Sequence, residues 1–196
     1  MKALVLVAHP DDETIFAGGA MLSSPEMEWS IQCVTYSAES ERGREFYAAV
    51  DGFRKAGVNI GLTEMLRQRD PEGGVIPASV YLQWEKAIRA HRVDADIVFT
   101  HNRLGDYGHP HHMAVNSIAR SIYGGRVPMC EFFYPGLTGV GFQHGGHSRL
   151  RCQDTRKLDI FKAAYGHRLD GLMYHLPEMM NFLLIECDER HACVSS

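Results

Sequence analysis

The sequence predicts an α/β fold with a Rossmann-like, mostly parallel β-sheet covered by helices on both faces. Residues 2–8, KALVLVA, form a continuous apolar run, which is typical of a strand buried on both faces of a parallel sheet. Strand-like and helix-like segments then alternate along the chain, which favours parallel strands joined by right-handed crossovers. We expect a single domain over residues 1–196, because 45% hydrophobic residues suffice for one sizeable core.

Each element is predicted from its own pattern. The first strand is followed by a helical stretch whose apolar residues, such as Ile15 and Phe16, lie on one face. Further strands are expected at residues 29–36, 58–62, 96–101, 128–134 and 182–187. Further helices are expected at residues 41–56, 78–92, 110–123 and 154–165. Residues 70–74 and 135–146 are rich in turn residues and are predicted to be loops. His144 and His147 belong to the second loop region and could reach the site, but solvated imidazoles are the favoured interpretation.

Charge and cysteine content exclude several classes of protein. A net charge of -4 leaves no basic field for nucleic acid, so we expect no nucleic-acid partner. The apolar start at residues 4–8 is too short for a signal peptide core or a bilayer span, so we expect a cytoplasmic protein without a membrane span. The 5 cysteines include no Cys-x-x-Cys pair, which argues against a disulfide framework and a thiolate zinc site. A homo-oligomer is compatible with this composition.

The first polar cluster, residues 9–13, reads HPDDE and directly follows the predicted N-terminal strand. Ionisable groups at the end of a buried strand are costly to desolvate unless they are paired or bound to a cation. Adjacent carboxylates leave the backbone in different directions, so one can bind a metal while the other accepts a proton. The alternative is a helix N-cap, in which Asp11 or Asp12 accepts backbone N–H groups and Glu13 interacts with the helix dipole.

The second cluster, residues 101–112, holds four of the 11 histidines. His109 and His112 are three residues apart across a predicted helix start, so they point to one face and can serve one site. The alternative is a helix cap with solvated imidazoles. His101 ends its predicted strand beside this cluster and is a candidate for holding a ligand or a loop in place.

Both clusters follow a strand and precede a helix, so both should face the crevice at the carboxyl edge of the sheet. Together they offer imidazole and carboxylate donors and no thiolate. Three such ligands with open positions for water are the arrangement of a catalytic zinc site, although these donors accept several divalent ions.

The motifs of the two clusters resemble those of a known family. AHPDDE at residues 8–13, with GHPxH at residues 108–112, is similar to the PIG-L or LmbE-like family of zinc-dependent N-acetylglucosaminyl deacetylases. Arg42-x-x-Glu45 and the helix predicted near residues 157–165 also fall where that family has similar features. The resemblance implies an LmbE-like fold and a hydrolase that removes an N-acetyl, or other N-acyl, group from a small-molecule amino sugar or sugar conjugate.

The resemblance also implies roles for individual residues. One Zn²⁺ per chain would be bound by His9, Asp12 and His112. Asp11 would be the general base that takes a proton from the attacking water. His109 would stabilise the oxyanion, and Tyr107 would assist the transition state.

Three residues are candidate substrate contacts. The resemblance implies this role for Arg42. Asp106 is a second candidate, and Glu39 follows the second predicted strand and is a third, with a surface ion pair as the alternative. This chain differs from many members of the family at His111, where they have an aspartate between the paired histidines.

Two other functions fit part of the pattern. His9-x-Asp11 with a distant histidine also satisfies the facial triad of non-haem iron oxygenases, but that fold is all-β and the alternating pattern argues against it. The second is a non-catalytic protein of the same fold that holds a sugar in the crevice. The complete set of candidate ligands and the candidate base favour an enzyme.

Overall fold

The computed structural model describes residues 1–72, 75–133, 148–151, 154, 156–166 and 184–187. Its centre is a seven-stranded sheet, in which five parallel strands are followed by two strands that are added through antiparallel pairings. Across the sheet the order is β3 (Ile60–Gln68), β2 (Glu28–Thr35), β1 (Lys2–Val7), β4 (Ile97–Thr100), β5 (Met129–Phe133), β7 (Leu184–Cys187) and β6 (Ser148–Arg151). The mostly parallel sheet predicted from the sequence is confirmed.

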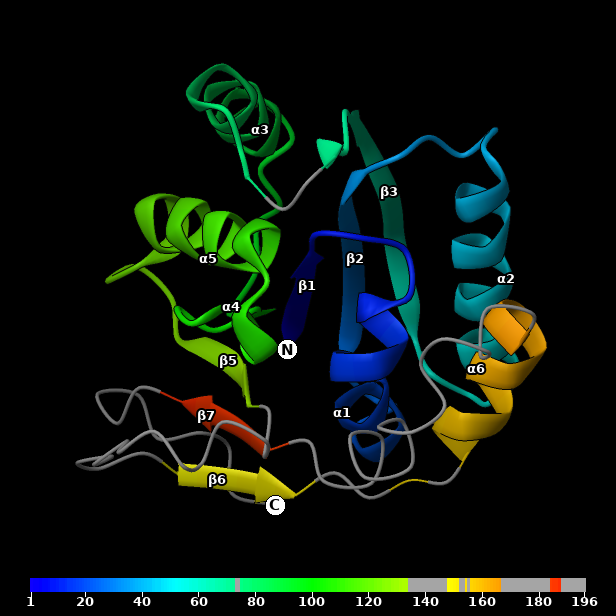
Figure 1. The fold of residues 1–196 in the computed structure, drawn as a ribbon. Coiled ribbons are helices and arrows are strands. Elements are labelled where there is room, and N and C mark those ends of the chain that lie inside the picture. Colours follow the sequence, from blue (N-terminus) through cyan, green and yellow to red (C-terminus); the bar gives the residue numbers. More distant parts are fainter. Residues whose placement is uncertain (73–74, 134–147, 152–153, 155, 167–183, 188–196) are drawn as a thin grey trace.

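Helices cover both faces of the sheet (Figure 1). One face packs against α1 (Gly18–Ser23), α2 (Glu41–Lys55) and α6 (Arg156–Tyr165). The other face packs against α3 (Ala78–Ala90) and α5 (Pro110–Tyr123). The short helix α4 (Gly105–Gly108) precedes α5, and a π-helical turn (Glu13–Ala17) precedes α1.

The central strand β1 is buried on both faces, as its apolar run predicts. Its side chains alternate between the two layers of the core. Ala3, Val5 and Val7 pack under α1, α2 and α6. Leu4 and Leu6 pack under α3 and α5. Each fully buried aliphatic side chain of this kind stabilises the fold by about 1.5–3 kcal/mol, so β1 is held from both sides.

The third strand differs from the prediction. Residues 58–62 were expected to form it, whereas β3 spans Ile60–Gln68 and contains Thr63, Glu64 and Arg67. These polar residues interrupt the apolar pattern because β3 lies at the edge of the sheet, paired only with β2, and is largely accessible to water. Its longer course carries the chain to the carboxyl edge of the sheet at Asp70.

The other predicted helices and strands lie within a few residues of their expected positions. β6, which pairs antiparallel with β7, was not predicted, because its four residues, SRLR, include two arginines and only one apolar residue. The loop expected at residues 135–146, with His144, and the neighbouring His147 lie outside the described residues.

The chain reverses direction across the sheet between β1 and β4. From β1 it runs outward through β2 to β3, and then crosses to β4 on the opposite side of β1. The loops that follow β1 and β4 therefore diverge to opposite faces and leave a crevice between them. Residues 8–13 and 101–112 border this crevice.

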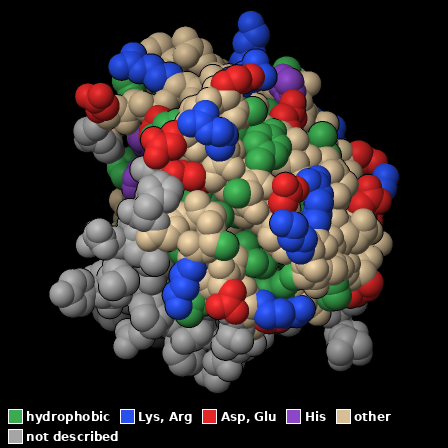
Figure 2. Space-filling view, turned by 90° about the vertical axis from the view of Figure 1, so that its right-hand side faces the viewer, with side chains coloured by type: hydrophobic (Ala, Val, Ile, Leu, Met, Phe, Trp, Pro, Cys, Tyr) green, Lys and Arg blue, Asp and Glu red, His purple; other side chains and the backbone are tan. Residues whose placement is uncertain are grey.

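The face formed by α2 and α6 carries Lys, Arg, Asp and Glu side chains interspersed with one another (Figure 2). This mixture agrees with the small net charge of -4. Among the described residues, the structure has no helix that is both long and apolar enough to cross a membrane.

The start of α2 depends on close backbone packing at Gly43. The Ser40 side chain caps the helix by accepting the Gly43 N–H at 2.9 Å. A Cβ atom at residue 43 would lie 2.0 Å from the Ser37 carbonyl oxygen and 2.8 Å from the Ala38 Cα. The backbone must therefore move if any side chain is placed there.

We predict that Gly43→Ala lowers the free energy of unfolding by about 1–3 kcal/mol, the usual cost of overpacking, measured by urea denaturation. Gly61→Ala is the matched control. The atom nearest to its Cβ would be Glu28 Oε1 at 3.5 Å, an ordinary van der Waals contact, so this variant should change stability by less than about 0.5 kcal/mol. Equal urea midpoints for the two variants would contradict the close packing at Gly43.

Candidate metal centre

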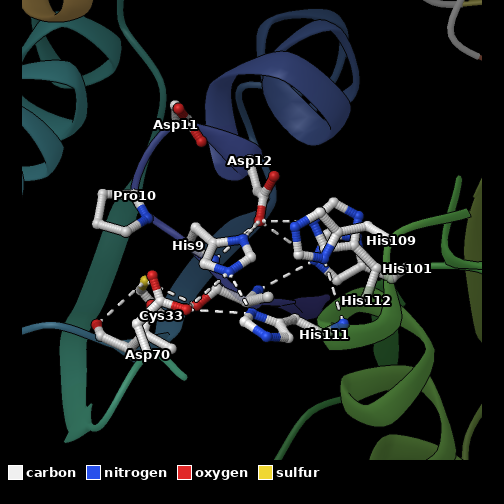
Figure 3. Close-up of polar contacts among 12 residues, drawn as sticks. His9, Pro10, Asp11, Asp12, Cys33, Asp70, His101, His109, His111 and His112 are labelled. Atoms are coloured by element: carbon white, nitrogen blue, oxygen red, sulfur yellow. Dashed lines mark hydrogen bonds and ion pairs between the residues drawn. The ribbon is translucent and has the colours of Figure 1, made fainter. Parts of the chain in front are cut away.

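The loop after β1 separates the two adjacent carboxylates of the first cluster. Asp11 has φ 108°, a left-handed conformation that is strained for a residue with a side chain. The Glu13 carboxylate holds this conformation by accepting the Asp11 N–H at 2.9 Å. As a result, Asp12 points into the histidine cluster, whereas Asp11 is set apart from it (Figure 3).

Glu13 is itself fixed by a distant part of the chain. It is fully buried, and its other oxygen accepts hydrogen bonds from Thr14 Oγ1 at 2.6 Å and from the Tyr165 hydroxyl of α6 at 2.8 Å. Burial raises the pKa of Glu13 to about 7. From the sequence, Glu13 was expected only to interact with the helix dipole. Nothing in the local sequence indicates its contact with Tyr165, which lies 152 positions away.

His9, Asp12 and His112 bring three potential ligand atoms together. Asp12 Oδ2 lies 3.4 Å from His9 Nδ1 and 3.4 Å from His112 Nε2. All three atoms fall within 4.8 Å of one another, close enough to contact one cation. The structure thus brings together the three residues that the resemblance implied as ligands.

His112 supports the fit of a metal ion to this group. Its Nδ1 atom lies 2.9 Å from Asp106 Oδ2 and donates to that carboxylate, so Nε2 carries the lone pair. Nε2 is buried and has no hydrogen-bond partner among the described residues. A buried, unpartnered lone pair directed at a carboxylate is costly unless a cation lies between them, so the donor set fits a divalent metal such as zinc.

The charges around His9 also favour a bound cation. Burial alone would lower the pKa of His9, but its hydrogen bonds to Asp12 and Asp70 and the charge of Asp12 raise it to about 9. The site therefore attracts positive charge, which a proton supplies when no metal is bound.

Asp106 holds two histidines at once. Its carboxylate is fully buried and accepts from His101 Nδ1 at 2.5 Å as well as from His112. The Ala8 N–H donates to His101 Nε2 at 3.0 Å, so His101 carries its proton on Nδ1. Asp106 was expected to contact substrate, but its carboxylate faces these two rings and does not line the pocket described below. His101 holds this carboxylate in place, as its position at the strand end suggested.

A pocket of about 250 Å³ opens beside the ligand group. It is lined by His9, Asp11, Asp12, Ile15, Phe16, Tyr36, Arg42, Asp70, Tyr107 and His109. The sequence analysis missed Tyr36 and Asp70, which follow β2 and β3. Asp70 was assigned to a connecting loop because β3 was predicted to end too early; the correct end would have placed it at the same sheet edge as the two clusters.

Arg42 holds the Asp11 side chain at the wall of this pocket. Its guanidinium donates to Asp11 Oδ2 at 2.8 Å and to the Pro10 carbonyl oxygen, and it pairs with Glu45 at 3.2 Å. Burial and the charge of Asp12 raise the pKa of Asp11 to about 6, and Arg42 limits the increase. Asp11 Oδ1 has no hydrogen-bond partner within the described part of the chain.

His109 and Tyr107 reach the pocket from the second cluster. His109 caps α5, where its Nδ1 accepts the His111 N–H at 3.2 Å, so its proton is on Nε2. Burial and neighbouring histidine rings lower the pKa of His109 to about 4, which keeps the ring neutral. Tyr107 is half-exposed at the pocket wall.

Glu39 lies away from the pocket. Its side chain is 70% exposed and forms an ion pair with Arg67 at 3.3 Å. The structure therefore shows the surface ion pair that the sequence analysis gave as the alternative to a substrate contact.

We predict that Asp106→Asn weakens divalent-cation binding by about 10–100-fold. A neutral amide oxygen accepts the two histidine N–H groups less strongly than the charged Oδ2 that now accepts both, and the amide nitrogen would face the Asn102 N–H that Oδ1 accepts at 3.2 Å. Competition with a chromogenic chelator measures the affinity. Asp51→Asn, which changes an exposed carboxylate of α2, is the control. The predicted support by Asp106 is wrong if both variants bind the cation as tightly as the unchanged protein.

Comparisons with solved structures show the fold. A deacetylase triple mutant of the teicoplanin biosynthetic pathway superposes with a TM-score of 0.69 at 14% identity, covering 98% of this chain and 100% of that one. N,N'-diacetylchitobiose deacetylase from Pyrococcus horikoshii has a TM-score of 0.59 at 16% identity, covering 97% and 86%. The 4-carboxy-2-hydroxymuconate hydratase of Pseudomonas putida has a TM-score of 0.60 at 16% identity, covering 100% and 98%.

Comparisons of sequence show the family. The uncharacterized protein L374 of Acanthamoeba polyphaga mimivirus is 26% identical over 143 residues, which are 67% of this chain and 60% of that protein. The chain thus spans 60% of the length of this relative. The model of the PIG-L family, GlcNAc-PI de-N-acetylase, matches residues 4–123, which include both histidine-containing clusters. The chain therefore belongs to the PIG-L family.

Proposed function

We propose that this protein is a zinc-dependent hydrolase that removes an N-acetyl group from an amino sugar or sugar conjugate. The observation that carries the proposal is the group of His9, Asp12 and His112, with its unpartnered His112 Nε2, beside a pocket that Asp11 also lines. Membership of a family described as GlcNAc-PI de-N-acetylase supports this reaction class. The two deacetylases of the same fold agree with it.

His9, Asp12 and His112 would hold the zinc ion. When bound, zinc lowers the pKa of water toward ~7 and polarises a carbonyl group. Asp11 is the general base in this proposal and takes a proton from the attacking water at Oδ1. Arg42 binds Oδ2 of the same carboxylate and so fixes the direction in which Oδ1 points.

His109 is proposed to stabilise the negative charge that develops on the acyl oxygen. Its neutral ring carries a proton on Nε2, as the hydrogen bond at Nδ1 requires. A fixed N–H donor of this kind stabilises an oxyanion without needing to reorganise. Tyr107, at the same wall of the pocket, is the proposed second group that assists the transition state.

The pocket suits a small polar substrate. Its volume of about 250 Å³ is near the lower end of the ~300–1,000 Å³ typical of sites for drug-sized ligands, and most of its lining residues are polar or charged. Arg42 and Asp70 line the pocket with a guanidinium and a carboxylate that can bind sugar hydroxyl groups. We propose both as substrate contacts.

The structure favours neither an iron oxygenase nor a non-catalytic sugar-binding protein, the two alternatives considered from the sequence. The α/β fold is not the all-β fold of the oxygenases that use His-x-Asp…His, and Asp12 rather than Asp11 lies with His9 and His112. A sugar-binding protein without activity would not need Asp11 to be held beside the candidate metal ligands. The hydratase neighbour shows that the same fold serves other reactions, so turnover must be tested directly.

We predict acetate release from at least one member of a panel of free, nucleotide-linked, lipid-linked and thiol-conjugated N-acetylated sugars. Release should stop when zinc is chelated and return when zinc is restored. Because His112 is a proposed ligand, His112→Gln should lose both the bound ion and turnover. No release from the panel, with zinc bound and with hydration of 4-carboxy-2-hydroxymuconate observed instead, would overturn the proposed reaction.

We also predict that Asp11→Asn lowers turnover by about two to four orders of magnitude, the usual contribution of a positioned general base, while zinc content stays unchanged. Steady-state acetate release and metal analysis of the same sample measure the two quantities. Asp51→Asn is again the control, since it changes a carboxylate on the exposed side of α2. Full turnover in Asp11→Asn with normal zinc content would show that another group is the base.

A further inference from the structure

A second group of potential ligand atoms lies on the other side of the His9 ring. His9 Nε2 lies 2.9 Å from His111 Nδ1 and 3.5 Å from Asp70 Oδ1. His111 Nδ1 lies 3.1 Å from the same Asp70 oxygen. Figure 3 shows these three side chains meeting below the His9 ring, opposite to Asp12. They come from the ends of β1 and β3 and from the first turn of α5.

Once His9 Nδ1 binds a cation, no placement of the ring protons gives hydrogen bonds to all three of His9 Nε2, His111 Nδ1 and Asp70 Oδ1. His9 then keeps its remaining proton on Nε2, which donates to the lone pair of His111 Nδ1. That lone pair also faces Asp70 Oδ1 at 3.1 Å, so two acceptors are in contact. If His111 Nδ1 instead carries a proton, it faces the His9 Nε2 proton at 2.9 Å, and two donors are in contact.

A cation would satisfy all three lone pairs. The separations of 2.9, 3.1 and 3.5 Å are close to the ~3.3 Å expected between ligand atoms around a tetrahedral ion with bonds of ~2.0–2.1 Å. The donors are two imidazole nitrogens and one carboxylate oxygen, which suit zinc and similar divalent ions.

We propose that His9, Asp70 and His111 form a second divalent-cation site. This proposal rests on the proposed function, because His9 is also a ligand of the first proposed metal site. His9 then bridges two ions as an imidazolate, and the proton of its Nε2 leaves to solvent. Because the two ions share one imidazole ring and repel each other at this short separation, the second ion binds more weakly than the first. His9 and Asp70 both line the pocket, so an ion between them occupies part of the proposed sugar site.

The position of the His111 ring is set by its packing in the core. In this chain His111 is 3% exposed and packs edge-on against Trp84 at 5.5 Å, which fixes the direction of Nδ1.

The test counts bound zinc per chain over a range of buffered free zinc concentrations, with the full-length protein and elemental analysis. The unchanged protein should bind two ions in two steps, the second with an affinity at least tenfold lower. His111→Phe, which preserves the packing against Trp84, and Asp70→Asn should each bind one. Tyr36→Phe is the matched control for Asp70→Asn, because it removes the hydrogen bond to Asp70 at 2.9 Å but no ligand, and it should still bind two.

The His112→Gln variant separates the two sites. If the protein binds one ion that His112→Gln removes and that His111→Phe and Asp70→Asn retain, the second site is wrong and the proposed first site stands. If Asp70→Asn and His111→Phe remove the only ion and His112→Gln retains it, the second site stands and the first is wrong. Should His111→Phe fail to fold, Asp70→Asn against Tyr36→Phe decides the second site alone. A protein that binds no ion contradicts both.

Discussion

The arrangement of the site depends on one buried carboxylate, that of Asp106, shared between His101 and His112. Through His101 it is connected to the backbone of Ala8 at the end of β1, and through His112 to the first turn of α5. A single residue thus joins the two loops that border the crevice. Its own backbone has φ 64° and ψ -71°, an unusual conformation that must be maintained by these contacts. The direction of the His112 lone pair, and with it the donor set around Asp12, follows from this carboxylate.

The sheet holds the buried carboxylates and imidazoles around Asp106 in place. β1 is buried from both sides, so the loop that follows it starts from a rigid point, and four neighbouring parallel strands end at the same edge. The carboxylates and imidazoles that follow the carboxyl ends of these strands are buried together. A buried polar group without a partner is costly, which explains why the described polar groups of the site contact one another so densely.

The sequence predicted those parts of the molecule that depend on local pattern. Continuous apolar runs identified β1 and β4, and the proline at the start of α5 identified that helix. The proposed ligands His9, Asp12 and His112 came from motif resemblance, and the structure places them together. The role of Asp106 was not predicted, because its contacts with His101 and His112, although local in sequence, depend on the unusual backbone conformation of the short α4 turn. The position of Asp70 was missed because it depends on where β3 ends. β3 was placed too early because an edge strand does not need an apolar pattern on both faces. Glu39 was a plausible substrate contact by position, but its side chain turns to Arg67.

The hydrogen bond between Tyr165 and Glu13 has a consequence for how the protein matures. The strained backbone at Asp11 is held by Glu13, and Glu13 is held in part by a hydroxyl group that is made 152 residues later. During synthesis the sheet order β3-β2-β1-β4 can form from the first hundred or so residues, before α6 exists. The loop after β1 would then lack one of its anchors. The proposed base therefore has its complete set of contacts only when α6 is in place, whereas the proposed cation ligands all lie in the part of the chain that precedes α6.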